Sequence, residues 1–216
     1  MIKANNIYYS YDKLQVLKGV DLEVKKGEFI SIVGDSGAGK TTLLQLLGTL
    51  EKIQKGTLEI NNQNIKNLSE KELNHFRNQE IGFVFQFHNL LPEFTALENI
   101  CLPGFISGIK KEKVEKRANE LIEHLGLSNR SNHKPNELSG GEQQRVAVAR
   151  ALINSPSIIL ADEPSGNLDS KNANILHNLL LNLNKKFQQT LIVITHNNTF
   201  ADLADRKLKI LDGKII

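Results

Sequence analysis

The sequence predicts an α/β fold with a mostly parallel sheet, an N-terminal antiparallel β part and a helical insertion. Short apolar strands alternate with helical patterns, which is typical of parallel sheets whose faces are covered. The first sixty residues have strand and turn patterns, whereas the middle of the chain is charged and helical. We therefore expect one domain over residues 1–216, with a core at 1–86 and 157–216 and a helical subdomain at 87–156.

The N-terminal elements are predicted from turn residues and apolar runs. Residues 21–24, a Lys-Lys-Gly turn and residues 29–33 have the pattern of a hairpin that leads into a core strand. Residues 57–60, followed by two asparagines, predict another hairpin. The segment 41–50 is apolar on most faces, which indicates a buried helix.

The later elements alternate between helix and strand. Residues 110–126 carry apolar side chains at spacings of three and four among many charges, which predicts an amphipathic helix. The elements expected after it are helix 142–154, strand 158–161, helix 172–187 and strand 191–195.

Composition excludes several classes of function. Lys and Arg total 27 against 24 Asp and Glu, and a net charge of +3 is too weak to favour nucleic acid or an anionic membrane as the main partner. The one cysteine, Cys101, permits no internal disulfide and is expected to be a small buried hydrophobe in a reducing compartment. No apolar run approaches the roughly 20 residues of a membrane helix. We therefore expect a chain that acts at a membrane only through a partner.

A phosphate-binding loop is predicted where an apolar strand meets a helix. The stretch SIVGDSGAGKTT, residues 31–42, matches G-x-x-x-x-G-K-[ST], and its glycines allow several backbone N–H groups to face one phosphate chain. An ordinary glycine-rich turn is the alternative, which Lys40 and Thr41 disfavour. Lys40 is expected at the β and γ phosphates, and the Thr41 hydroxyl at Mg²⁺. The expected nucleotide-binding residues here are Gly34, Asp35, Ser36, Gly37, Ala38, Gly39, Lys40, Thr41 and Thr42.

Two further strands end in polar residues. Ligands bind at the carboxyl ends of parallel strands, which is where Asp162 and Glu163 follow the apolar run IILA. Asp162 is expected to hold Mg²⁺ through water, and Glu163 to act as the general base that orients the attacking water. His196 follows another buried strand and is expected to donate a hydrogen bond to the γ-phosphate. The alternatives are a surface acidic pair and a structural histidine.

A second phosphate site is predicted in LSGGEQQR, residues 138–145. Ser139 with Glu142 forms a capping box, which by itself explains only those two residues. Gly140 and Gly141 each weaken a helix by up to about 1 kcal/mol relative to alanine. Their presence in the first turn indicates that something approaches the backbone closely, as an anion does at a helix N-terminus.

Together these motifs resemble the ATP-binding subunits of ABC transporters, over essentially the whole chain and in the family's order. The motifs are GDSGAGKT, VFQF with Gln86, LSGGEQQR, IILADEP, SGNLD and the TH that ends at His196. The resemblance implies an ATPase that uses Mg²⁺ and dimerises head to tail on binding ATP. Each nucleotide then lies between the phosphate loop of one subunit and the LSGGE of the other.

The resemblance also implies individual roles. Tyr11 is similar to the aromatic residue that stacks on adenine, and its neighbours Tyr8 and Tyr9 are the alternatives. Gln86 is similar to the glutamine that contacts Mg²⁺ and links the core to the helical subdomain, and Asp169 to a residue that contacts the opposite subunit. The partner's nucleotide is expected to meet Ser139, Gly140, Gly141 and Glu142.

Within the family, QFHNLLPEFTALENI, NHKPNELSGGE and ADEPSGNLD most resemble the lipoprotein-releasing (Lol) branch. That resemblance implies a peripheral subunit at the cytoplasmic face of the inner membrane. Integral membrane subunits of the LolC/LolE type are expected to dock near Phe87, Leu90 and Leu91. MacB-like exporters and FtsE-type cell-division ATPases remain alternatives. A soluble P-loop NTPase or kinase is the alternative from another class, and it would not need LSGGE.

Overall fold

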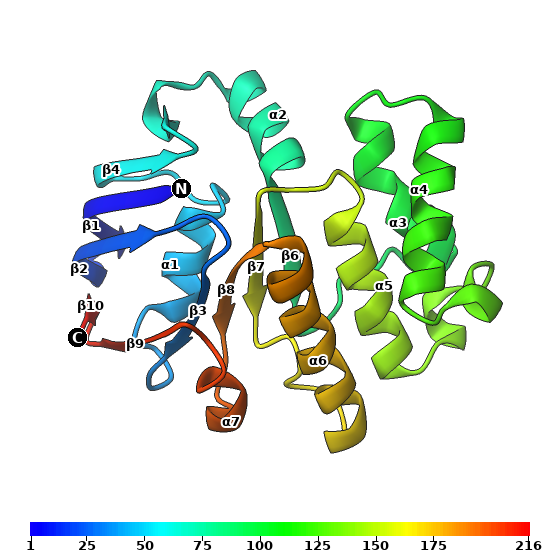
Figure 1. Ribbon diagram of the computed structural model, residues 1–216. Coiled ribbons are helices and arrows are strands. Elements are labelled where there is room, and N and C mark those ends of the chain that lie inside the picture. Colours follow the sequence, from blue (N-terminus) through cyan, green and yellow to red (C-terminus); the bar gives the residue numbers. More distant parts are fainter. The chain divides into compact units, whose positions relative to one another are not determined.

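The computed structural model describes all 216 residues, and the chain folds as two units (Figure 1). Unit 1 comprises Met1–Arg77 and Leu183–Ile216, and unit 2 comprises Asn78–Asn182. These boundaries differ from the expected division into a core at 1–86 and 157–216 and a helical subdomain at 87–156. That division stays a prediction.

The antiparallel part predicted at the N-terminus is a four-stranded sheet in unit 1, in the order β2-β1-β4-β5. Its strands are β1 (Ile2–Tyr11), β2 (Leu14–Val24), β4 (Lys55–Ile60) and β5 (Gln63–Asn64). The hairpin predicted after residue 57 is confirmed: Asn61 and Asn62 join β4 to β5 with φ of 51° and 62°. Two-residue hairpin loops often require positive φ at both positions, and asparagine tolerates it.

The other predicted hairpin, between residues 21–24 and 29–33, is wrong. Strand β2 pairs with β1, whereas β3 (Phe29–Val33) lies in another sheet between β8 (Thr190–Ile194) and β9 (Arg206–Leu211), parallel to both. Strand β3 is buried along nearly its whole length, and such a strand is most stable inside a sheet whose two faces are covered. Strand β10 (Lys214–Ile215) pairs antiparallel with β9.

Helix α1 (Lys40–Leu47) is the buried helix predicted at 41–50, and it contacts both β2 and β8. It ends earlier than expected, because Gly48 caps it and Thr49 adopts a left-handed φ of 58°. Helix α7 (Asn198–Ala201) packs on β3, with the rings of Phe200 and Phe29 centred 5.6 Å apart. Helix α2 (Glu70–Glu80) leads from unit 1 into unit 2.

Unit 2 combines a pair of parallel strands with packed helices. Strand β6 (Ile81–Phe85) pairs with β7 (Ile158–Asp162), and helix α5 (Gly140–Leu152) packs on β6. Helices α3 (Ala96–Ile106) and α4 (Lys111–His124) pack on each other and on α5, and α6 (Ser170–Phe187) runs on into unit 1. The helices expected at 110–126, 142–154 and 172–187 and the strands expected at 158–161 and 191–195 are confirmed with shifted ends.

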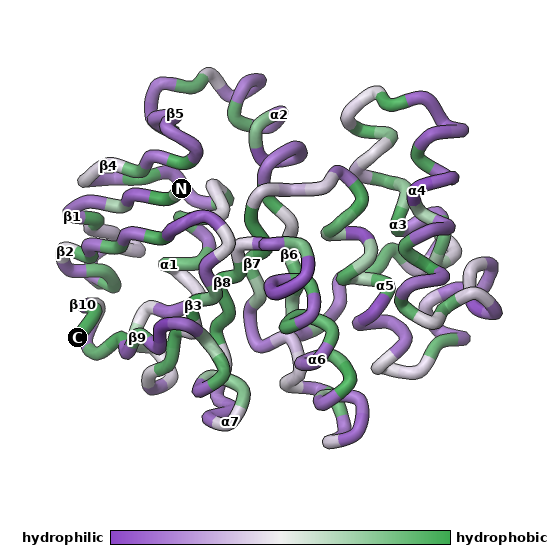
Figure 2. The backbone as a smooth tube through the Cα atoms, in the orientation of Figure 1, coloured by the Kyte–Doolittle hydropathy of each residue, from purple (hydrophilic) through white to green (hydrophobic).

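Burial follows the hydropathy of each element. Strands β7 and β8 are almost wholly hydrophobic, whereas α4 alternates between polar and apolar residues (Figure 2). Cys101 lies inside unit 2, where burial raises the pKa of its thiol to about 11, as fits a small apolar residue. No helix of the structure combines the length and apolar character that crossing a membrane requires.

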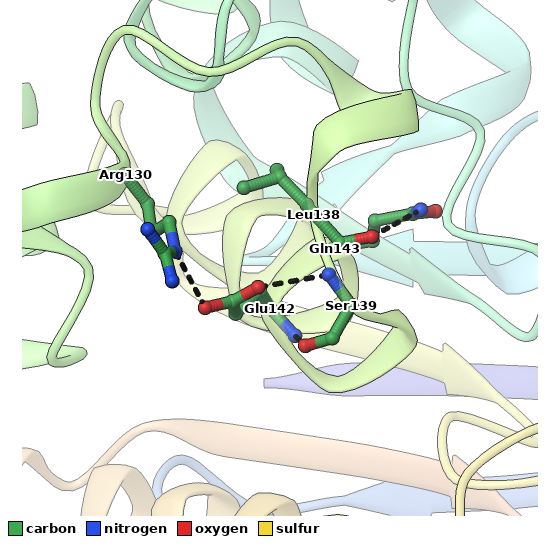
Figure 3. Close-up of polar contacts among 5 residues, drawn as sticks. All are labelled: Arg130, Leu138, Ser139, Glu142 and Gln143. Atoms are coloured by element: carbon green, nitrogen blue, oxygen red, sulfur yellow. Dashed lines mark hydrogen bonds and ion pairs between the residues drawn. The ribbon is translucent and has the colours of Figure 1, made fainter.

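Two α-helices of unit 2 begin with a capping box. At α5, the backbone N–H of Ser139 donates to Glu142 (2.8 Å), and the Arg130 guanidinium donates to the other carboxylate oxygen (2.9 Å; Figure 3). Together these bonds lower the pKa of Glu142 to about 2, and the bond from Ser139 has the largest effect. Thr95 and Glu98 form the corresponding box at α3, and Thr95 lowers the pKa of Glu98.

We predict that Glu142→Gln lowers the free energy of unfolding by about 1 kcal/mol at pH 7. Since the folded-state pKa is depressed, the carboxylate stabilises the fold above its unfolded pKa, and this contribution is lost as the pH falls from about 4.5 toward 2. The difference between parent and variant in urea unfolding should therefore be smaller at pH 4 than at pH 7. Glu98→Gln is the control, because Glu98 belongs to a capping box that has no arginine partner. If both variants lose the same free energy of unfolding, the Arg130–Glu142 ion pair adds nothing to stability.

Candidate functional site

The predicted phosphate loop lies in unit 1, between the end of β3 and the start of α1. Gly34 has a φ of 151°, and a Cβ there would lie 2.3 Å from the carbonyl oxygen of Ile210, so no larger residue fits. Gly37 also has a positive φ (79°), and no atom lies within 4 Å of its ideal Cβ position. Asp35 and Ser36 are exposed. The loop is thus tight against the sheet at its start and open at its tip.

The start of α1 is suited to an anion. Its N-cap, Gly39, offers no side-chain acceptor, and the first turn contains no acidic residue. The Lys40 side chain is buried, and its Nζ donates to the carbonyl oxygens of Gly34 (2.8 Å) and Asp35 (2.9 Å). The N–H groups of the first helical turn, the helix dipole and the Lys40 ammonium group therefore concentrate positive charge along this loop.

His196 reaches the same edge of the same sheet. Strand β8 runs parallel to β3, Ile194 is paired with Ile32, and the Thr195 N–H donates to the Ile32 carbonyl (3.3 Å). His196 follows Thr195 and is exposed. The residues after β3 and after β8 therefore share one edge, as the sequence predicts for the phosphate loop and His196.

Tyr11 differs from its two neighbouring tyrosines. Its side chain is 43% exposed at the end of β1, and its hydroxyl donates to Gln45 of α1 (3.3 Å). Tyr9 is only 6% exposed, and its hydroxyl donates to Glu51 (2.7 Å). The Tyr8 ring lies 4.5 Å from the Lys55 ammonium. Among the three, Tyr11 is the ring with a free surface beside the helix of the phosphate loop.

In unit 2 the parallel pair β6–β7 brings the other predicted groups to one edge. Phe85 is paired with Asp162, so Gln86 and Glu163 follow at neighbouring strand ends. Glu163 has a left-handed φ of 45°, and backbone conformations of this kind cost about 1–3 kcal/mol and cluster at functional sites. Two carboxylates and one amide therefore meet at this edge.

The segment 165–169 contributes two contacts that the sequence did not indicate. The Gln86 amide nitrogen donates to Asn167 (2.9 Å), whose own amide nitrogen donates to the Gln86 carbonyl (3.2 Å). Gly166 is tightly placed, since a Cβ there would lie 2.9 Å from the Gln86 amide nitrogen. Because that nitrogen is engaged, the amide oxygen of Gln86 is the atom that can face a ligand.

The two glycines of LSGGE have different surroundings. An ideal Cβ at Gly140 would meet only Leu168, at 3.8 Å, whereas one at Gly141 would lie 2.3 Å from the Asn172 amide oxygen. Asn172 is held by Asp169, to which it donates from its backbone (2.9 Å) and from its side chain (2.6 Å). The close approach expected at this pair is thus made at Gly141 by the chain itself, and Gly140 is the open position.

The loop after Gln86 presents apolar side chains. We call residues 87–94 the apolar loop. Phe87 is 74% exposed, Leu91 43% and Phe94 37%, whereas Leu90 is half-buried. Of the three residues predicted to bind a membrane partner, Phe87 and Leu91 are thus available for contact, and Phe94 adds to them.

Known proteins resemble the chain over its whole length. The family model described as ABC transporter matches residues 17–166. The lipoprotein-releasing system ATP-binding protein LolD of Bacteroides fragilis (strain YCH46) is 56% identical, covering 100% of both chains, and LolD of Bacteroides thetaiotaomicron is 55% identical, covering 100% of this chain and 99% of its own.

Among solved structures, a dimer of the ATP-binding cassette MJ0796 in a post-hydrolysis state, bound to ADP and Pi, superposes with a TM-score of 0.90 at 43% identity, covering 100% of this chain and 96% of the other. The chain belongs to the ABC transporter family.

Proposed function

We propose that this chain is the ATP-hydrolysing subunit of an ABC transporter that releases lipoproteins from the bacterial inner membrane. One observation carries this proposal: the chain has two helix N-termini that could each bind an anion, and their first turns are capped in different ways. Helix α1 begins with an uncapped glycine and a buried lysine, and α5 begins with a capped turn whose Gly140 is open. Full-length relatives that are 56% and 55% identical are named as ATP-binding proteins of the lipoprotein-releasing system.

The first of these N-termini would bind the chain's own ATP. Lys40 now donates to two neutral carbonyls, and hydrogen bonds from an ammonium group to phosphate oxygens are stronger than those. The backbone N–H groups from Gly34 to Thr42 would surround the phosphates, and Tyr11 would stack on the adenine. His196 would donate to the γ-phosphate from the same sheet edge as the loop.

The donor set suits Mg²⁺. In unit 2 the Asp162 carboxylate and the Gln86 amide oxygen are hard oxygen groups of the kind that this ion prefers, and in unit 1 the Thr41 hydroxyl is another. When bound, the ion would neutralise charge that develops on the phosphates. Glu163 would accept a proton from the attacking water, and its constrained backbone would fix the direction of its side chain.

The second N-terminus would serve the nucleotide of another copy. Ser139, Gly140, Gly141 and Glu142 would face the ATP held by the phosphate loop of the partner in a head-to-tail homodimer. A relative that is 43% identical is described as dimeric and bound to ADP and Pi, which supports this arrangement. One chain then needs two phosphate-binding turns because each serves a different ATP.

The apolar loop would bind integral membrane subunits of the LolC/LolE type through Phe87, Leu91 and the half-buried Leu90. It follows Gln86 directly, so a change at the Mg²⁺-nucleotide site would reach the docking surface within a few residues. The subunit would then be peripheral at the cytoplasmic face of the membrane.

For the catalytic base, we predict that Glu163→Gln retains ATP binding but stalls hydrolysis, so that an ATP-bound dimer accumulates in gel filtration with Mg-ATP. The γ-phosphate contacts remain while the base is lost. Asp162→Asn is the matched variant at the neighbouring position. In this variant, Mg²⁺ should strengthen ATP binding less than it does in the parent. Hydrolysis by Glu163→Gln at the parent rate would contradict the assignment.

For assembly in trans, we predict that Gly140→Asp abolishes hydrolysis with little change in melting temperature, because the position is open and an acidic residue suits the first turn of a helix. Gly141→Asp should also lower the melting temperature, since its side chain would displace Asn172.

Mixing Gly140→Asp with an excess of Lys40→Ala chains sharpens this test. Each mixed dimer has one site built from an intact phosphate loop and an intact LSGGE, and the other site carries both lesions. Partial recovery of ATPase activity in the mixture supports the trans arrangement. Normal hydrolysis by Gly140→Asp alone would show that the turn is only a helix cap.

For docking, we predict that Leu91→Glu spares the ATPase activity of the isolated subunit but prevents co-purification with the membrane subunits. Burying an unpaired carboxylate at an apolar contact costs several kcal/mol, on the order of 2–7 for a polar group and more for a charge. Leu203→Glu, at another exposed leucine, should leave co-purification unchanged. If Leu91→Glu binds the subunits and releases lipoproteins from vesicles like the parent, the docking surface is elsewhere.

A further inference from the structure

The apolar loop contains two consecutive residues with left-handed backbone conformation. His88 and Asn89 are consecutive non-glycine residues with left-handed φ of 59° and 49°. Such conformations persist where surrounding groups hold them in place. Their backbone N–H groups bond locally, to the carbonyls of Phe85 and Phe87. Their other contacts come from a helix more than fifty positions away in the sequence.

Arg150, in the last turns of α5, binds the carbonyls of the same two residues. Its Nη1 donates to the Asn89 oxygen (2.7 Å) and its Nη2 to the His88 oxygen (2.8 Å). A planar guanidinium that engages two successive carbonyls fixes the direction of the chain as well as its position.

Gln144, in the second turn of α5, makes the second attachment. It is wholly buried; its amide nitrogen donates to the Phe85 carbonyl (3.3 Å), and its amide oxygen accepts a hydrogen bond from His88 Nδ1. Because the nitrogen faces a carbonyl, the oxygen must face the imidazole, so Nδ1 of His88 carries a proton. Burial lowers the pKa of His88, which favours the neutral ring with this single donor.

A buried amide of α3 holds the far end of the loop. Asn99 accepts from the Leu91 N–H (2.8 Å) and donates to the carbonyls of Leu91 (3.1 Å) and Phe94 (3.0 Å). The exposed side chains of Phe87, Leu91 and Phe94 therefore stand on a backbone fixed at both ends.

We infer that Gln144 and Arg150 are positioning residues that join the apolar loop to α5, so that the loop and the Ser139–Gly141 turn move as one piece. The two attachments are six residues apart, about 9 Å along the helix axis, which prevents the loop from pivoting on a single point. Because α5 begins at Gly140, a displacement of the loop is transmitted through one rigid element to the partner's phosphate site. The transmission of movement to the partner's phosphate site rests on the proposed function. The attachment of the apolar loop to α5 does not.

Hydrogen exchange measures the attachment in the isolated chain. Arg150→Met removes both donors and retains the apolar stem, and it should speed amide exchange over residues 87–91 by about tenfold or more, since hydrogen bonds from a charged group are lost. Gln144→Leu should affect the same segment, and Arg150→Lys should restore part of the protection.

Asn154→Leu is the control for general loss of buried hydrogen bonds. Asn154 lies just past α5 and donates to the carbonyls of Asn78 (3.0 Å) and Pro103 (3.1 Å), but not to the apolar loop. The Asn154→Leu variant should have a lower melting temperature, but its amide exchange at residues 87–91 should not speed up more than elsewhere. The inference would be overturned if neither Arg150→Met nor Gln144→Leu changed the exchange rate at residues 87–91. It would also be overturned if Asn154→Leu speeded exchange in this segment as much as they do.

Transmission is measured in the complex with the membrane subunits, as lipoprotein released per ATP hydrolysed. Arg150→Met should leave the KM for ATP and the ATPase rate of the isolated chain within about twofold, because it touches no nucleotide-binding residue. In the complex, release per ATP should fall at least fivefold and recover in part with Arg150→Lys. A parent-like ratio in Arg150→Met would overturn the transmission. If the parent chain binds no membrane subunits, the proposed function fails, and the exchange experiment still decides the attachment.

Discussion

Parallel pairing of buried strands is the constraint on which the rest of this structure depends. Because β3 and β8 run in one direction, the phosphate loop and His196 emerge at one edge of the sheet in unit 1. Because β6 and β7 also run parallel, Gln86 meets Asp162 and Glu163 in unit 2. Apolar strands that are covered on both faces leave only their ends accessible to ligands, so the reactive groups collect there.

The two helix N-termini show how one physical effect is used in two ways. At α1 the cap is a glycine without side-chain acceptors, and the added charge comes from Lys40, which is held by two carbonyls. At α5 Ser139 and Glu142 satisfy part of the first turn, and Arg130 balances the carboxylate. The first arrangement keeps its N–H groups for a ligand. The second keeps its shape without one, as the proposed role at the nucleotide of another copy would require.

Polar side chains fix the conformation of the segments around Gln86. Asn167 holds the Gln86 side chain, and the backbone beyond it is fixed by Gln144, Arg150 and Asn99. Each of these side chains bonds to backbone carbonyls, which remain costly to leave unpaired when buried. The exposed side chains of Phe87, Leu91 and Phe94 can therefore stay at the surface without collapsing onto the core. Satisfied polar groups, rather than apolar packing, define the loop's conformation.

The sequence by itself determined the features that depend on local chemistry. The glycine-rich turn between β3 and α1, the capping box at Ser139, the Asn61-Asn62 hairpin and most helices follow from turn residues, caps and apolar period. Tertiary structure decided what depends on distant partners. The segment 29–33 forms no hairpin with residues 21–24, because its burial requires strands from residues 190–211. Gly141 faces Asn172 and the apolar loop is held by Arg150, since these contacts join positions far apart in the chain and have no periodic signature.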